Sequence, residues 1–213
     1  IDLRLDAFGA LMTLLVSGIG VLVVLYARWY FPATKEHLGR LAGLLTLFAG
    51  AMLGVVWADN LLVLYTCWEL TSLTSYLLIG NDHRDPRARA AALHALLVTV
   101  TGGLAMLGGF VVLGQAAGTY RLSEILERAP SGSNVTIALL LVLVGVGTKS
   151  AQYPFHGWLP GAMAAPTPVS AYLHSATMVK AGIYLLARFA PVYALTGFWR
   201  PLVTAVGLVT MIL

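Results

Sequence analysis

Long apolar runs separated by short polar turns dominate the sequence. About 20 apolar residues are needed to cross the hydrocarbon core of a bilayer. Seven runs approach or reach that length, near residues 8–26, 41–57, 61–80, 90–114, 134–163, 169–189 and 201–213. The pattern predicts an all-α integral membrane protein, a polytopic helix bundle of about seven spans that forms a single domain over residues 1–213. Because the sequence opens at Ile1 without an initiator methionine, we expect it to be part of a longer chain.

Prolines interrupt the fifth run. Pro154 and Pro160 lie in its second half, and a proline inside a helix removes a backbone donor and clashes with the preceding turn. The segment from Phe155 to Met163 is too short to cross a membrane alone. We therefore expect one discontinuous helix, whose first part reaches Tyr153 and whose second part is a half-helix.

Two further segments have a recognisable pattern. The fourth run contains the small residues Gly102, Gly103, Gly108 and Gly109, which allow helices in lipid to approach closely. The polar interval after it contains Leu122–Arg128, whose apolar spacing predicts a short amphipathic helix at the membrane interface. Asp59 lies in a short turn, where we expect it to cap a helix.

Glu69 lies about 13 Å into the third run, which places a carboxylate near the bilayer midplane. Tyr65, Ser72 and Tyr76 share its helical face. A carboxylate inside a membrane is a functional candidate by default. The alternative is a structural ion pair that holds two helices together.

Lys149 is positioned late in the fifth run, just before the interruption. If Glu69 is near, movement of a proton on the carboxylate would switch the lysine between its charged and neutral forms, as in a proton relay. Alternatively, the ammonium of Lys149 satisfies the last carbonyls of its own helix.

The sixth run adds His174 and Lys180, which lie about 120° and about 9 Å apart on a helix. We expect successive stations of a relay, with water or the hydroxyls of Ser175 and Thr177 between them. His174 as a packing residue is the alternative. His156, in the half-helix, is a weaker pathway candidate or an interfacial cap. The tryptophans near span ends are interpreted as interface residues: Trp57, Trp68, Trp158 and Trp199.

Composition agrees with a membrane protein. Hydrophobic residues make up 59% of the chain and charged residues 10%, and the mean hydropathy is +0.84. The net charge of +4 comes from basic residues between the apolar runs, without the aromatic interleaving of a nucleic-acid surface. The sequence has one cysteine and no phosphate-binding loop, metal-ligand cluster or nucleophile–histidine–acid set. We therefore expect no enzyme activity, metal, cofactor or nucleic-acid partner, and transport energy from an ion gradient or from other subunits.

Three stretches carry a family resemblance. Residues 68–80 and 149–160 resemble the antiporter-like subunits that respiratory complex I shares with the Mrp cation/proton antiporters. Residues 162–182 look most like the Mrp branch, in which Lys180 within Met-Val-Lys-Ala-Gly is the distinguishing feature. In that family the fold is a pair of inverted repeats, each with a discontinuous helix, and the resemblance implies that this chain holds the first repeat and little of the second. Gly157 and Gly161 depart from the bulkier or polar residues expected there.

The resemblance implies a function and a location. The family's glutamate–lysine pair maps onto Glu69 and Lys149, and its relay histidine and lysine map onto His174 and Lys180. It implies a multi-pass subunit of a Na⁺/H⁺ antiporter in a bacterial inner membrane, with lipid, protons, Na⁺ and other Mrp subunits as partners. The main alternative is a proton-translocating subunit of a complex I-like oxidoreductase or a membrane hydrogenase. A non-transporting scaffold, whose charges only hold helices together, is a third interpretation.

Overall fold

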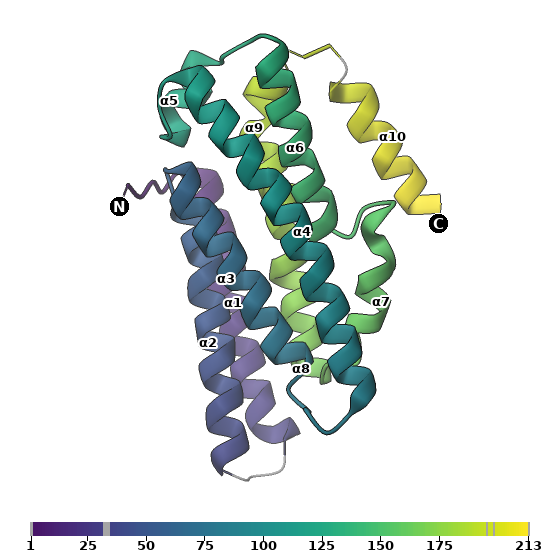
Figure 1. The fold of residues 1–213 in the computed structure, drawn as a ribbon. Coiled ribbons are helices and arrows are strands. Elements are labelled where there is room, and N and C mark those ends of the chain that lie inside the picture. The colour runs from purple at the N-terminus through teal and green to yellow at the C-terminus, as the bar shows by residue number, and fades with distance from the viewer. Residues whose placement is uncertain (1, 32–34, 195, 198, 213) are drawn as a thin grey trace.

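The computed structural model describes residues 2–31, 35–194, 196, 197 and 199–212, and it forms an all-α bundle (Figure 1). The main helices are α1 (Ala7–Tyr30), α2 (Lys35–Trp57), α3 (Leu61–Ile79), α4 (Pro86–Ala117), α5 (Leu122–Arg128), α6 (Ser133–Lys149), α7 (Trp158–Ala162), α8 (Thr167–Ser170), α9 (Met178–Tyr193) and α10 (Trp199–Ile212). A 3₁₀ turn, η1 (Phe155–Gly157), precedes α7. A π-helical segment, η2 (Ala171–Thr177), joins α8 to α9 without a break.

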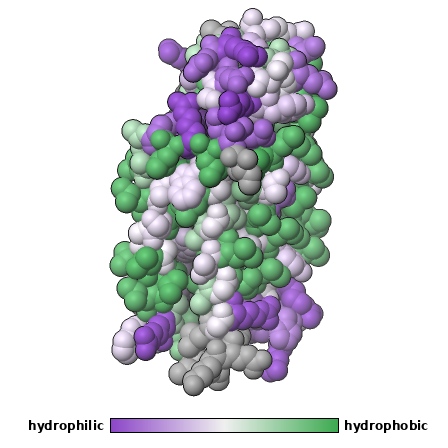
Figure 2. Space-filling model, turned by 90° about the vertical axis from the view of Figure 1, so that its left-hand side faces the viewer, coloured by the Kyte–Doolittle hydropathy of each residue, from purple (hydrophilic) through white to green (hydrophobic). Residues whose placement is uncertain are grey.

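The surface of the bundle fits a bilayer. Among the described residues, α1, residues 39–57 of α2, α3 and α4 are long and apolar enough to cross a membrane by length and composition. The face drawn in Figure 2 has an apolar band between two hydrophilic ends. Large apolar side chains are exposed on the bundle, for example Leu14 and Leu97. The predicted all-α membrane bundle with a discontinuous helix is confirmed by these membrane-length apolar helices and by the separation of α6 from η1 and α7.

Glycines bring α4 and α6 together. A Cβ atom at Gly102 would overlap the side chain of Thr148, and one at Gly109 would meet the backbone oxygen of Ala138 at 2.5 Å. These two glycines therefore serve the close approach that the sequence predicts. Gly108, by contrast, faces Leu141 at an ordinary contact distance of 3.8 Å.

Backbone hydrogen bonds join the chain at the end of the bundle that carries the N-terminus and α5. The N–H of Arg4 donates to Trp57 at 2.8 Å, and the N–H of Asp59 donates to Asp2 at 3.0 Å. The N–H of Leu61 donates to Tyr120 at 2.9 Å, and the N–H of Leu122 donates to Asp59 at 2.8 Å. The helix α5 has the predicted bounds. Asp59 caps this distant helix by accepting from the N–H and hydroxyl of Ser123, whereas Asn60 caps α3.

The interruption of the fifth run differs from the expectation. The helix α6 ends at Lys149, four residues before Tyr153, because Ala151 takes a left-handed conformation with φ of 50°. Pro154, preceded by a cis peptide bond, lies in the following turn. Pro160 does not break a helix. It lies in the first turn of α7, where a backbone N–H has no intrahelical partner to lose.

Candidate functional site

The last residue of α6 places an amine in the interior of the bundle. Lys149 has an exposed fraction of 0%. At the end of α6 the Val146 carbonyl accepts from the N–H of Ser150, and the Gly147 carbonyl accepts from the N–H of Gln152. A lysine is rarely fully buried unless its charge has partners. The site is therefore defined by what surrounds this amine.

The partners of Lys149 lie on α3, across the bundle. Its Nζ donates to the Trp68 carbonyl oxygen at 3.1 Å and to Ser72 Oγ at 2.7 Å. The same nitrogen lies 5.2 Å from the centroid of the Trp68 ring, within the range of a cation–π contact. We call these three groups the α3 seat. The hypothesis that Lys149 satisfies the carbonyls of its own helix is wrong, since other donors reach those carbonyls.

Glu69 is on the same turn of α3 but points toward α4. A Cβ atom at Gly103 would overlap Glu69 Oε1, so the absence of a side chain at residue 103 makes room for the carboxylate. That oxygen is buried and has no hydrogen-bond partner among the described residues. Glu69 and Lys149 interact electrostatically. Among the described residues, however, Glu69 and Lys149 do not form a salt bridge with each other.

Trp158 links the end of α6 to His174. The indole Nε1 donates to the carbonyl of Thr148 at 2.9 Å, which satisfies one of the last backbone acceptors of α6. On its other side the Trp158 ring lies against the His174 ring, with 5.9 Å between centroids. The tryptophan is fully buried. One side chain from the half-helix therefore contacts both the backbone next to Lys149 and the histidine.

His174 lies in the π-helical segment η2, which periodicity alone does not predict. Neither ring nitrogen has a hydrogen-bond partner within the described residues, although the backbone of Ser170 is close. Ser175 donates to Ala171 and Thr177 donates to Tyr172, both one turn back on the same helix. In this structure both hydroxyls donate to backbone carbonyls, so a connection from His174 to Lys180 through water or through these hydroxyls stays a prediction.

The remaining pathway candidates lie outside this interior group. Lys180 is exposed on α9, and His156 is exposed in η1, where it stacks on Tyr153 with 5.9 Å between ring centroids. The structure thus brings together Glu69, Lys149 and, through Trp158, His174. It leaves Lys180 and His156 on the surface of the described residues.

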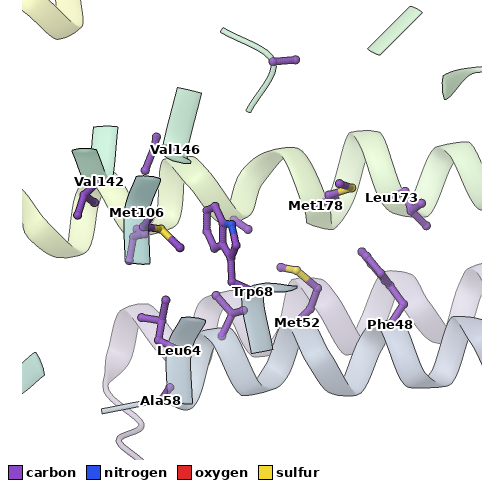
Figure 3. Close-up of a cluster of buried hydrophobic side chains, with 14 of the residues drawn as sticks. Phe48, Met52, Ala58, Leu64, Trp68, Met106, Val142, Val146, Leu173 and Met178 are labelled. Carbon is purple, nitrogen blue, oxygen red and sulfur yellow. The ribbon is translucent and has the colours of Figure 1, made fainter. Parts of the chain in front are cut away.

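Two tryptophans of the site contradict the sequence-based interpretation. Trp68 and Trp158 each have an exposed fraction of 0%, so they are not interface residues. Figure 3 shows Trp68 extending into the apolar core, with Met106, Val146 and Met178 around it. Its position in the span suggests a membrane interface. The sequence signal that could have placed Trp68 in the site is that it directly precedes Glu69. Within the described residues, no group of three His, Cys, Asp or Glu side chains could hold a metal ion.

Comparison with known proteins identifies the family of this chain. Residues 58–213 match the family model described as "NADH:quinone oxidoreductase/Mrp antiporter, TM". Residues 1–40 match the model described as "NADH-Ubiquinone oxidoreductase (complex I), chain 5 N-terminus". The first match covers most of the chain and includes α3, α6 and the half-helix, which carry the site.

Individual relatives are similar over nearly the whole chain. The chain is 51% identical to a probable K⁺/H⁺ antiporter subunit of Rhizobium meliloti, over 99% of this chain and 21% of that protein. It is 50% identical to a Na⁺/H⁺ antiporter subunit of Alkalihalophilus pseudofirmus, over 97% of this chain and 26% of that protein. The chain thus spans about a fifth to a quarter of the length of these relatives.

A solved structure has the same fold. It is the Mrp complex from Dietzia sp. DQ12-45-1b, with a TM-score of 0.82 and 45% identity over 88% of this chain and 21% of that chain. The resemblance to MrpA, the large subunit of the Mrp branch, is therefore confirmed. The chain belongs to the NADH:quinone oxidoreductase/Mrp antiporter transmembrane family.

Proposed function

We propose that this chain is the proton-conducting part of the large subunit of an Mrp-type Na⁺/H⁺ antiporter. The observation that carries the proposal is the fully buried amine of Lys149, which faces the turn of α3 that also bears Glu69. An amine inside a membrane bundle is costly to bury, and such residues mark ion or proton pathways. The protein is a secondary transporter subunit rather than an enzyme, and the proton-motive force drives it.

Each residue has a role in this proposal. Glu69 biases the charge of Lys149 through space. Lys149 exchanges protons with His174 through water. Trp158 contacts both the Thr148 carbonyl and the His174 ring, and neither His174 ring nitrogen has a hydrogen-bond partner in the described part of the chain. Lys180 passes protons onward from the outer face of α9 to parts of the protein beyond these residues. His156, also exposed, is a peripheral station.

The setting of the protein is part of the same proposal. Relatives of similar sequence are named as antiporter subunits and come from bacteria. This supports a bacterial inner-membrane location, other Mrp subunits as partners, and protons and Na⁺ as the transported ions. The names favour antiport over the redox-driven pump of a complex I-like assembly, although the family description includes both.

The test replaces the two central residues in the complete antiporter. Glu69→Ala and Lys149→Ala should each reduce cation-driven proton movement in everted membrane vesicles to background, while native gels show an assembled complex. Glu124→Ala is a matched control, because Glu124 forms its ion pairs with Arg121 and Arg128 on and next to the interfacial helix α5. Undiminished antiport in both central variants would refute the proposal.

A further inference from the structure

The Lys149 amine is held by hydrogen-bond acceptors other than the nearby carboxylate. Around α3, Ser72 lies about 40° from Trp68 and about 60° from Glu69. The Lys149 amine contacts the first two residues, whereas the Glu69 carboxylate is turned toward Gly103 on α4. The α3 seat and Glu69 thus present two alternative sets of acceptors to one ammonium. In this structure the seat is occupied, and Glu69 Oε1 has no partner among the described residues.

We propose that Ser72 is a positioning residue that holds Lys149 on the α3 seat, away from Glu69, so that the amine alternates between these two places. The inference deepens the proposed function and rests on it. Ser72 is the side chain of the seat that makes the shorter bond, at 2.7 Å, and it is fully buried. A hydrogen bond to a charged group inside a protein is stronger than one between neutral groups.

Lys149 can leave the seat without leaving a buried acceptor unsatisfied. The Trp68 carbonyl also accepts from the Thr71 hydroxyl at 2.7 Å and, at 3.5 Å, from the hydroxyl of Ser72. When the amine moves to Glu69, these bonds remain and the partnerless carboxylate oxygen gains a donor. The first position gives the amine two hydrogen bonds and the second gives it a carboxylate partner, so each position has favourable contacts of its own, as a two-position element requires. Without the seat, the amine would stay paired with Glu69.

The experiment compares three variants of the complete antiporter complex. Ser72→Ala removes the acceptor. The maximal rate of cation-driven proton movement should fall on the order of tenfold, with the apparent KM for the cation unchanged, because a positioning bond rather than cation binding is lost. Ser72→Thr keeps a hydroxyl and should restore most of the rate. Ser75→Ala removes a similarly buried hydroxyl of α3 that donates to the Ser72 carbonyl, and it should leave the rate unchanged.

A second measurement is the position of the amine. A cryo-EM map of the Ser72→Ala complex should show Lys149 Nζ paired with Glu69. If Ser72→Ala does not assemble, Ser72→Cys, with its weak sulfur acceptor, takes its place with the same expectation. The inference would be overturned if Ser72→Ala and Ser75→Ala had equal rates, or if Lys149 Nζ in Ser72→Ala still bound the Trp68 carbonyl. In both cases Lys149→Ala would remain inactive. Full activity of Lys149→Ala would instead overturn the proposed function itself.

Discussion

Glu69 keeps its place because residue 103 has no side chain. Its carboxylate enters the space between α3 and α4 that a Cβ atom at Gly103 would occupy. Among the four glycines that the sequence singles out in α4, this one therefore provides room for a charged group, whereas Gly102 and Gly109 bring helices together. Residues of one type in one run thus have different purposes, which only the packing reveals.

Gly103→Ala tests whether Glu69 needs the space beside residue 103. The added methyl group would displace the Glu69 carboxylate from α4, and we expect antiport in everted vesicles to fall on the order of tenfold, since a misplaced functional group can cost more than that. Gly108→Ala is the control, because its Cβ would meet only Leu141 at 3.8 Å. Wild-type transport by Gly103→Ala would show that the carboxylate does not need this space.

The sequence locates the ionisable residues of the site but not the residues that surround them. Glu69 and Lys149 are conspicuous because charge is rare in apolar runs. Trp68 and Trp158 are not, since a tryptophan is common both in cores and at membrane interfaces. Which α3 groups hold the Lys149 amine depends on rotation of α3 against α6, and local sequence does not encode that rotation.

At the scale of elements, the start of α1 is tied to α9. Asp6 caps α1 by accepting from the N–H of Gly9 at 2.8 Å, and the same carboxylate binds the guanidinium of Arg188. Arg188 Nε donates in turn to the Tyr184 hydroxyl at 2.8 Å, which donates to the Val56 carbonyl on α2. Three helices are therefore joined by one carboxylate and its partners.

Asp6→Asn separates the two roles of this residue. Asparagine is a good N-cap, so the α1 cap remains and only the charge that binds Arg188 is lost. The thermal midpoint of the solubilised complex should fall by the equivalent of about 1 kcal/mol or less, because the pair is partly exposed. Asp6→Ala, which also removes the cap, should cost about 0.5–2 kcal/mol more.

The pH dependence follows from the pKa of the Asp6 carboxyl, which Arg188 holds below its ordinary value. A group with a depressed pKa in the folded state stabilises the protein above its unfolded pKa of about 4, and this stabilisation is lost as pH falls through the folded pKa. The difference between wild type and Asp6→Asn should therefore be present at pH 7 and disappear at strongly acidic pH. A difference that persists there would show that the charge is not its origin.

Some elements follow from the sequence and others do not. The helix α5 has the predicted bounds because its amphipathic pattern is local and lies between turns. Pro154 is the obvious stop for α6 and predicts an end at Tyr153, but the left-handed Ala151 ends the helix at Lys149. The π-helical η2 could not be predicted, since the spacing of apolar residues in the sixth run does not distinguish a π-helix from an α-helix.

At the scale of the molecule, the apolar band is the surface suited to contact with lipid. It lies between hydrophilic ends in Figure 2. Leucines of α4 such as Leu93 and Leu97 are also exposed. The membrane bundle as a whole is the most predictable feature, because a chain with 59% hydrophobic residues is best accommodated by helices that face lipid.

Cysteine labelling tests the apolar exterior. The test uses the complete complex with Cys67→Ala, and Arg84 lies in the exposed loop between α3 and α4. The thiol introduced by Arg84→Cys should react with a hydrophilic maleimide in opened vesicles. A cysteine at Leu97 should not react, although Leu97 is 58% exposed, because its environment excludes water and suppresses the thiolate. Equal labelling at both positions would show that this face of α4 meets water.

The backbone hydrogen bonds among Arg4, Trp57, Asp59 and Leu122 have a mechanical consequence. They fasten the start of the chain, the α2–α3 turn and the start of α5 to one another at a single rim of the bundle. The opposite end is held by the α3–α4 loop and by side-chain contacts such as that between the hydroxyls of Tyr30 on α1 and Thr167 on α8, 3.4 Å apart. Because side-chain contacts yield more easily than this set of backbone hydrogen bonds, we expect water to reach Lys149 first from the end that carries the α3–α4 loop.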